Sequence, residues 1–285
     1  MTAVLIGYDV EACAIGEGLA CLGAHSGHGM GEAVDRTATR RGLEIIRRNH
    51  EEFEAPATLF VCGRTLVHNI DVLEPFVDHP LFDIQQHTYS HVLLKDDGWK
   101  GGTFLASPPE AVWQELTQTS DAFRRILGVE IIGLRTPHGY ANGIADRPDM
   151  LEVVSDCGIK FISSWGRNAQ GGNPTPMSVQ PYWYEDQGYP ELLEIPFQGW
   201  LDGTWFEEYG IERGAEYATV LTATADEAAE MDGVYGACFH DWAQIRYRET
   251  ETAWANTLLR HCRSAGIPLL SYNDYYRLRL AERSE

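Results

Sequence analysis

The chain has 285 residues, of which 44% are hydrophobic and 22% are charged, and its formal net charge is −20. A surface this acidic repels phosphate backbones, which argues against a nucleic-acid partner. No stretch approaches the roughly 18 to 20 continuous apolar residues of a membrane helix, so the sequence also argues against a membrane partner.

The N-terminal residues and the cysteines bear on the compartment. The opening MTAVLIGYDV lacks the basic start and small-residue cleavage site of a signal peptide, and we therefore expect a cytoplasmic protein. The six cysteines form no C-x-x-C pair, so no zinc knuckle or redox motif is visible. Cys62 and Cys238 stand inside apolar runs and are expected to be buried free thiols.

Short apolar runs alternate with helix-like segments along the chain. The runs are continuous rather than strictly alternating, which is typical of parallel strands covered on both faces. We expect strands over residues 3–8, 57–62, 81–85, 130–135, 160–165, 191–197, 234–239 and 267–272.

Helices are predicted between these strands, over residues 33–53, 107–127, 146–158 and 249–266. Ser107 stands three residues before Glu110, which indicates a capping box. Gly158 and Gly266 are expected to end their helices as C-cap glycines. Repeated strand–helix alternation in one domain predicts an α/β fold of the (β/α) barrel type. A doubly wound open sheet is the alternative, although no G-x-G-x-x-G follows the first strand.

Two irregular stretches interrupt the pattern, residues 12–32 and 166–190. Long loops of this kind often form lids or binding walls. His25 and His28 lie in the first stretch, where we expect a lid without a metal role.

Ionisable residues follow strands that are far apart in the sequence. Asp9 and Glu11 end the first strand, His87 and His91 follow the third, Arg135 ends the fourth, and His240 ends the seventh. In a barrel these strand ends converge on one face, where active sites lie.

The two histidines of QQHTYSH are spaced by four residues, as on one side of a helical turn. Alone, such a pair is more often two ordinary histidines. With a carboxylate from Asp9 or Glu11, it predicts a two-histidine, one-carboxylate metal site with an open position for water. We expect one divalent metal, and zinc, iron, cobalt, nickel and manganese all suit these ligands.

The sequence resembles the polysaccharide deacetylases, carbohydrate esterase family 4, over nearly the whole chain. QQHTYSH is similar to the family motif H-[ST]-x-x-H, LRTPHG to R-x-P-x-G, and FHDW to the Leu-His-Asp motif. ATLFVCG resembles the strand that precedes the first of these motifs. The resemblance implies a single-domain deformed (β/α)7 barrel over residues 1–285 and one metal, usually zinc.

Two motifs depart from the family pattern. GYDVE stands where the family has T-F-D-D-G, and it resembles a cytoplasmic branch that includes the helicobacter-type peptidoglycan deacetylase and hydrolases of cyclic ureides and imides. By that resemblance Asp9 would be the general base and Glu11 the third ligand, with Asp9 as ligand the alternative. The fourth motif offers Trp165 without the family's Asp, so the partner of the acid histidine stays open.

The chemistry of these groups implies a mechanism for amide hydrolysis. The metal lowers the pKa of a bound water, and Asp9, oriented by Arg135, takes the proton of that water. His240 protonates the leaving amine, and a backbone N–H near Tyr89 is expected to help stabilise the oxyanion. The residues expected to contact the substrate are Tyr89, Pro137, Gly139, Trp165 and Trp242, and for the two tryptophans packing is equally expected. His138 is expected to line the pocket, and Asp241 to support the backbone or His240.

Three functions are weighed on this basis. The first is N-deacetylation of an amino-sugar-containing substrate, a small molecule or an oligosaccharide. The second is hydrolysis of a cyclic amide at the same site, and the third is a non-catalytic binding barrel. Aromatic residues at 182–184 and 199–206 offer surfaces for sugar rings or for a subunit interface, so a homo-oligomer is a further expectation.

Overall fold

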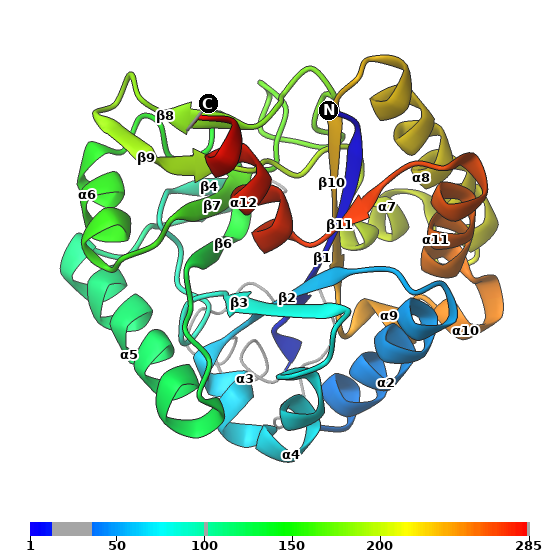
Figure 1. Ribbon diagram of the computed structural model, residues 1–285, viewed down its shortest axis with the longest axis horizontal. Helices are drawn as coiled ribbons and strands as arrows, with labels where there is room; N and C mark the ends of the chain where they lie inside the picture. The colour runs from blue at the N-terminus through cyan, green and yellow to red at the C-terminus, as the bar shows by residue number, and fades with distance from the viewer. Residues whose placement is uncertain (13–35, 100–101, 284–285) are drawn as a thin grey trace.

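The strands of the main sheet follow the apolar runs of the sequence. The computed structural model describes residues 1–12, 36–99 and 102–283 (Figure 1). Within these residues the sheet has nine strands in the order β10–β1–β2–β3–β6–β7–β9–β8, with β11 paired to β1. They are β1 (Ala3–Val10), β2 (Ala57–Val61), β3 (Phe82–Gln86), β6 (Gly133–Tyr140), β7 (Phe161–Trp165), β8 (Tyr182–Tyr184), β9 (Tyr189–Glu194), β10 (Val234–His240) and β11 (Leu269–Leu270).

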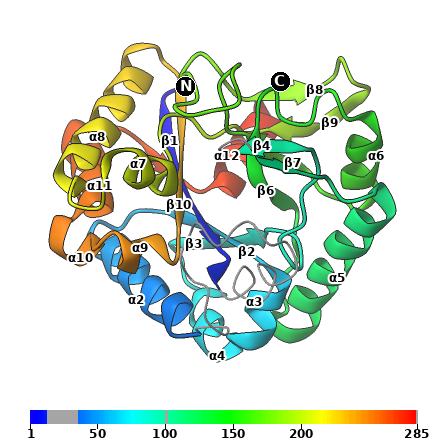
Figure 2. The same ribbon diagram turned by 180° about the vertical axis from the view of Figure 1, so that it is seen from behind.

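Helices surround the curled sheet, as both views show (Figures 1 and 2). The first half of the chain supplies α2 (Arg36–Glu52), α3 (Gly63–His68), α4 (Ile70–Leu73), the 3-10 turn η2 (Glu74–Phe76), α5 (Pro109–Leu127) and α6 (Pro148–Asp156). The second half supplies α7 (Asp202–Tyr209), α8 (Gly214–Glu230), α9 (Ala243–Arg246), α10 (Glu249–Thr252), α11 (Trp254–Ala265) and α12 (Tyr272–Glu282). A separate hairpin consists of β4 (Asp97–Trp99) and β5 (Gly102–Phe104).

The order of the strands confirms the predicted fold class. From β1 to β9 the parallel strands follow one another in chain order without a switch point, which excludes the doubly wound alternative. No ladder joins β9 to β10 among the described residues. The segment after β9 bridges this gap, because the Gln198 N–H donates to the Gly236 carbonyl at 3.0 Å and the Gly236 N–H donates to Gln198 Oε1 at 2.7 Å.

Side chains alternate along β1 between two buried layers. Val4, Ile6 and Tyr8 belong to the large core beneath the helices, whereas Ala3 and Leu5 belong to a smaller core inside the sheet. Because successive side chains of a strand point to opposite faces, Gly7 and Asp9 continue the inner row. The first strand therefore carries Asp9 into the interior.

Several local predictions can be compared with the structure. Gly158 and Gly266 have positive φ values of 77° and 70°, as expected of glycines that end helices. The prediction of a capping box at Ser107 and Glu110 is wrong, because Pro108 is the N-cap of α5 and no side chain caps the start of this helix. The single helix predicted over 249–266 is wrong as well, since Ala253, at φ 51°, separates α10 from α11.

The structure also bears on the predictions about the cysteines and about membrane helices. Cys62 and Cys238 are buried free thiols, as predicted. None of the helices in the described residues is long and apolar enough to cross a membrane.

Candidate active site

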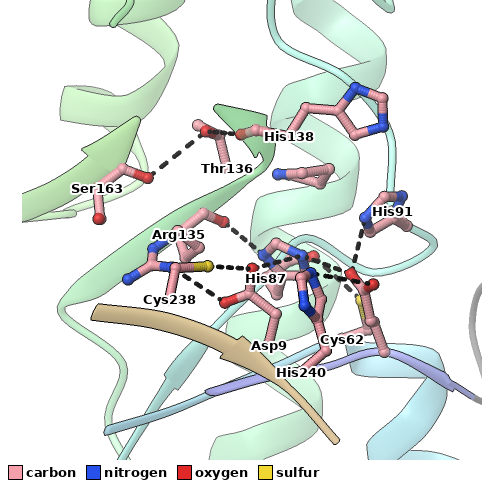
Figure 3. A network of polar contacts seen from close by, with 12 residues as sticks. Asp9, Cys62, His87, His91, Arg135, Thr136, His138, Ser163, Cys238 and His240 are labelled. Atoms are coloured by element: carbon pink, nitrogen blue, oxygen red, sulfur yellow. Dashed lines mark hydrogen bonds and ion pairs between the residues drawn. The ribbon is translucent and has the colours of Figure 1, made fainter. Parts of the chain in front are cut away.

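Four strands direct the predicted side chains into one cluster. Figure 3 shows Asp9, His87, Arg135 and His240 side by side, although they come from β1, the end of β3, β6 and β10. His91 approaches the same cluster from the loop that follows β3. The structure thus brings together residues that are up to 231 positions apart in sequence numbers, because parallel strands end at one face of the barrel.

Three of these residues have the geometry of a metal site. His87 Nε2 and His91 Nε2 lie 3.0 and 2.9 Å from the same oxygen, Glu11 Oε2. The candidate ligand atoms of the three residues all lie within 4.8 Å of one another. Two imidazoles and one carboxylate are the donor set of many catalytic zinc sites, so the residues present fit a divalent metal.

Neighbouring groups orient these candidate ligands. His87 Nδ1 lies 2.9 Å from the Arg135 carbonyl oxygen, which accepts a hydrogen bond from Nδ1–H. This contact fixes the ring so that Nε2 faces Glu11. Burial alone would raise the pKa of Glu11, but the charge of His91 and the hydrogen bonds of both histidines hold that pKa well below its usual value. A carboxylate that stays ionised in a buried site is suited to bind a cation.

The histidine pair does not lie on a helical turn, so that part of the prediction is wrong. Residues 87–91 form an irregular loop in which Thr88 and His91 have positive φ values of 58° and 66°. Such backbone is strained for residues other than glycine and persists only where its surroundings hold it. Glu115 of α5 holds this loop by accepting the N–H groups of Tyr89 and Ser90 at 2.9 and 2.6 Å. These two N–H groups are therefore already bonded in this structure, rather than directed at an oxyanion.

Asp9 lies beside the candidate metal site and contacts Arg135. Arg135 Nη1 donates to Asp9 Oδ1 at 3.3 Å, while Asp9 Oδ2 lies 3.9 Å from His87 Nε2. The guanidinium is fully buried and stacked 4.5 Å from the ring centres of both Phe60 and Phe197. Despite burial, nearby groups that include Tyr272 and Asp9 raise the pKa of Arg135, which keeps it charged.

A second group of possible ligands shares Glu11 and consists of Asp9, Glu11 and His240. A cation at this position would lie close to the positive guanidinium that contacts Asp9, and like charges in a buried site repel strongly. The geometry therefore favours Glu11, and not Asp9, as the carboxylate ligand beside His87 and His91.

The partner of His240, left open by the sequence, is Asp202 at the start of α7. Asp202 Oδ1 lies 2.5 Å from His240 Nδ1, and Oδ2 accepts the His240 backbone N–H at 2.8 Å. Burial alone would lower the pKa of His240, but the fully buried Asp202 carboxylate outweighs it and raises that pKa to about 10. The residue was missed because it stands in GWLDGTWF, a stretch interpreted only as aromatic surface; its lone acid was the available signal.

The residues that follow His240 support Glu11. Asp241 Oδ1 accepts the backbone N–H groups of Glu11 and Ala12, both at 3.3 Å, in keeping with the predicted backbone role. Trp242 is only 2% exposed, and its Nε1–H donates to Glu11 Oε1 at 3.0 Å. In this structure Trp242 thus contacts the candidate ligand rather than an open surface.

Other predicted contact residues form the walls of the site. Pro137 and Gly139 are buried, and a Cβ on Gly139 would lie 2.4 Å from Phe197. Trp165 is half-buried, and its backbone N–H donates to Glu194 Oε1 at 2.8 Å. His138 Nδ1 lies 2.7 Å from Asp97 Oδ2, which ties the β4–β5 hairpin to the site. Their contact with a substrate stays a prediction, and His25 and His28 lie outside the described residues.

The aromatic stretch at 199–206 contributes mainly to the core. Trp205 and Phe206 are 8% and 2% exposed, and both pack against Tyr217. Their prediction as surfaces for sugar stacking is therefore wrong. Tyr184 is buried as well, whereas Tyr182, Trp183 and Trp200 remain half-buried.

Comparison with known proteins agrees with the motifs. Residues 34–162, which contain QQHTYSH and LRTPHG, match the model of the polysaccharide deacetylase family, and this confirms the resemblance to the family for that part of the chain. The resemblance to its cytoplasmic branch stays a prediction. No curated protein sequence gives a significant match to this chain.

Solved structures share the fold at low sequence identity. A protein from Mycobacterium smegmatis assigned as a polysaccharide deacetylase superposes with a TM-score of 0.72 at 18% identity, covering 99% of this chain and 91% of its own. PuuE allantoinase gives 0.71 at 16%, covering 96% and 89%. A second assigned deacetylase, from Pseudomonas aeruginosa PAO1, gives 0.65 at 15%, covering 84% and 73%. At these identities the superpositions show a shared fold.

Proposed function

We propose, with the polysaccharide deacetylase match as premise, that this protein hydrolyses a carbon–nitrogen amide bond with one divalent metal and deacetylates an amino-sugar-containing substrate. The observation that carries the proposal is the buried Glu11–His87–His91 trio, with Asp9 Oδ2 3.9 Å from His87 Nε2 and His240 Nε2 3.8 Å from Glu11 Oε1. A nucleophile, a base and an acid are the parts that amide hydrolysis requires.

The metal would be held by Glu11, His87 and His91, and zinc is the first choice for this donor set. A divalent cation supplies Lewis acidity there, which polarises a carbonyl and makes a water molecule a stronger acid. Iron, cobalt, nickel and manganese bind similar ligands, so the identity of the metal needs measurement.

The chain's own residues would move the protons. Asp9 accepts a proton from the attacking water, and the Arg135 contact at 3.3 Å orients its carboxylate. His240 donates a proton to the leaving nitrogen, which otherwise would leave as an unstable amide anion. The pKa of about 10 means that His240 carries its proton at neutral pH and is ready to act as the acid.

Hydrolysis of a cyclic amide is the second candidate. PuuE allantoinase resembles this chain about as closely as the Mycobacterium smegmatis protein does, and it supports this alternative. The same base and acid would open a ring, and both fragments would remain in one product.

Elemental analysis of the purified protein tests the proposal first. We expect about one metal per chain, and none in the His87→Ala/His91→Ala variant. His79→Ala/His261→Ala is the matched control, because both of these histidines pair with surface carboxylates elsewhere and should not affect the metal.

A substrate panel then separates the candidates. It contains N-acetylated amino sugars, simple linear amides and hydantoin-like rings, each assayed with wild type and with Asp9→Asn. Activity confined to the acetylated sugars and lost in Asp9→Asn supports deacetylation, whereas activity confined to the rings supports the second candidate. No metal even after dialysis against zinc, or a metal-replete protein inactive on all three classes, would favour a non-catalytic barrel.

A further inference from the structure

A buried tyrosine, Tyr272, contacts the arginine that orients the proposed base. Arg135 Nη2 donates to the Tyr272 hydroxyl at 2.8 Å, while Nη1 of the same guanidinium donates to Asp9 at 3.3 Å. We infer that Tyr272, the first residue of α12, is a positioning residue that acts through Arg135 on Asp9. The inference rests on the proposed function, in which Asp9 is the base.

The stacking of Arg135 explains why the tyrosine matters. The guanidinium lies 4.5 Å from the ring centres of Phe60 and Phe197. Contacts with ring faces are weakly directional, so they hold the plane of the group and still allow it to slide within that plane. The hydrogen bonds that the edge of the guanidinium donates, which include the one to the Tyr272 hydroxyl, then decide where Nη1 lies relative to Asp9.

The strands leave space for this pair. A Cβ on Gly7 of β1 would lie 2.8 Å from Arg135 Nη2, and a Cβ on Gly236 of β10 would lie 2.9 Å from the Tyr272 hydroxyl. These are the strands that carry Asp9 and His240. Both lack a side chain where the Arg135–Tyr272 pair passes, so the interior of the barrel accommodates the pair.

Tyr272 is itself held on two sides. Its backbone N–H donates to Thr58 Oγ1 on β2 at 2.9 Å, and its ring meets Phe60 edge-on with 5.1 Å between ring centres. The side chain is fully buried, which excludes direct contact with a substrate. The residue that joins the Tyr272 hydroxyl to the proposed base is Arg135, and we infer that Tyr272 acts through it.

The test compares Tyr272→Phe with Tyr275→Phe. Tyr275 is a buried tyrosine of the same helix, and its hydroxyl accepts from Arg279 at 2.7 Å, away from Arg135. We expect Tyr272→Phe to lower kcat by about ten- to a hundredfold, with KM and metal content unchanged, because small misplacements of reacting groups have effects of this size. Tyr275→Phe should retain the wild-type kcat. Equal kcat values for Tyr272→Phe and wild type would overturn the inference.

A double-mutant cycle distinguishes positioning from a general packing effect. If Tyr272 acts through Arg135, Tyr272→Phe lowers kcat in the wild type and has little further effect when Arg135 is already Lys. The same fold-loss in both backgrounds would contradict the inference. Gly7→Ala would place a Cβ 2.8 Å from the same Nη2 and 3.2 Å from the Tyr272 ring, so it should also lower kcat with metal retained, and this result is independent of whether the tyrosine variant folds.

Failure of the inference can be told apart from failure of the function. A wild type without amide hydrolase activity removes both the proposed function and the positioning role. An active wild type that Tyr272→Phe matches removes the positioning role alone.

Discussion

Replacing Trp242 by phenylalanine removes the indole N–H that donates to the candidate metal ligand Glu11, together with part of a ring that packs against His240 and Tyr247. The indole N–H of Trp242 lies 3.0 Å from Glu11 Oε1, and both side chains are almost fully buried. Without the indole N–H, Glu11 Oε1 has no replacement donor at His240, because His240 Nε2 lies 3.8 Å away, which is too far for a hydrogen bond. Loss of such a ligand-orienting contact weakens metal binding about 10- to 100-fold, which corresponds to about 1.4 to 2.7 kcal/mol.

Competition with a chromogenic chelator measures this change in zinc affinity, starting from metal-free protein. Trp254→Phe is the matched control, since Trp254 is also buried and its indole nitrogen has no hydrogen-bond partner among the described residues. A Kd for Trp242→Phe within twofold of wild type, or an equal loss in Trp254→Phe, would refute the reasoning.

Three further perturbations have expected outcomes. Asp202→Asn should lower kcat by roughly 100-fold and leave the metal in place, because His240 loses the carboxylate that keeps it protonated. Glu115→Gln should weaken zinc binding about tenfold, because the loop between the two candidate histidine ligands loses the carboxylate that accepts its N–H groups. Burial lowers the pKa of His50 to about 4, below the roughly 6.5 of an unfolded chain, so its contribution to stability is present above pH 6.5 and lost as the pH falls to 4. Wild type should accordingly lose about 2 kcal/mol more unfolding free energy between pH 7.5 and pH 5 than His50→Gln does, as measured by urea titration.

Each of these predictions has a control. Asp226→Asn breaks a similar contact with a histidine, His261, on the surface and should leave kcat unchanged. Glu110→Gln alters an exposed acid of the same helix as Glu115 and should leave zinc affinity unchanged. Parallel stability curves for wild type and His50→Gln between pH 7.5 and pH 5 would contradict the assignment of that window to His50.

The strand ends could be predicted because they depend on local patterns. Continuous apolar runs mark buried parallel strands, and the ionisable residues that follow them must meet at one face of a barrel. Asp9, Glu11, His87, Arg135 and His240 were all found in this way, and the structure brings them together.

The supporting residues could not be predicted in this way, because only tertiary packing brings them to the site. Asp202 opens a short helix, Glu115 lies in the middle of α5, and Tyr272 begins the last helix. None of them belongs to a spacing pattern with the residue that it contacts. The loop at His87–His91 was mistaken for a helical turn because a four-residue spacing does not reveal positive φ values.

The register between β1 and β10 has a consequence for how this protein can change over evolution. Asp9 and His240 are direct partners across that ladder, so main-chain hydrogen bonds set their separation at one interstrand spacing of about 4.8 Å. The loops at the mouth of the barrel can therefore lengthen, shorten or change sequence without altering the distance between the two groups proposed to transfer protons. New substrates become accessible through loop variation while the reaction geometry is inherited unchanged from the sheet.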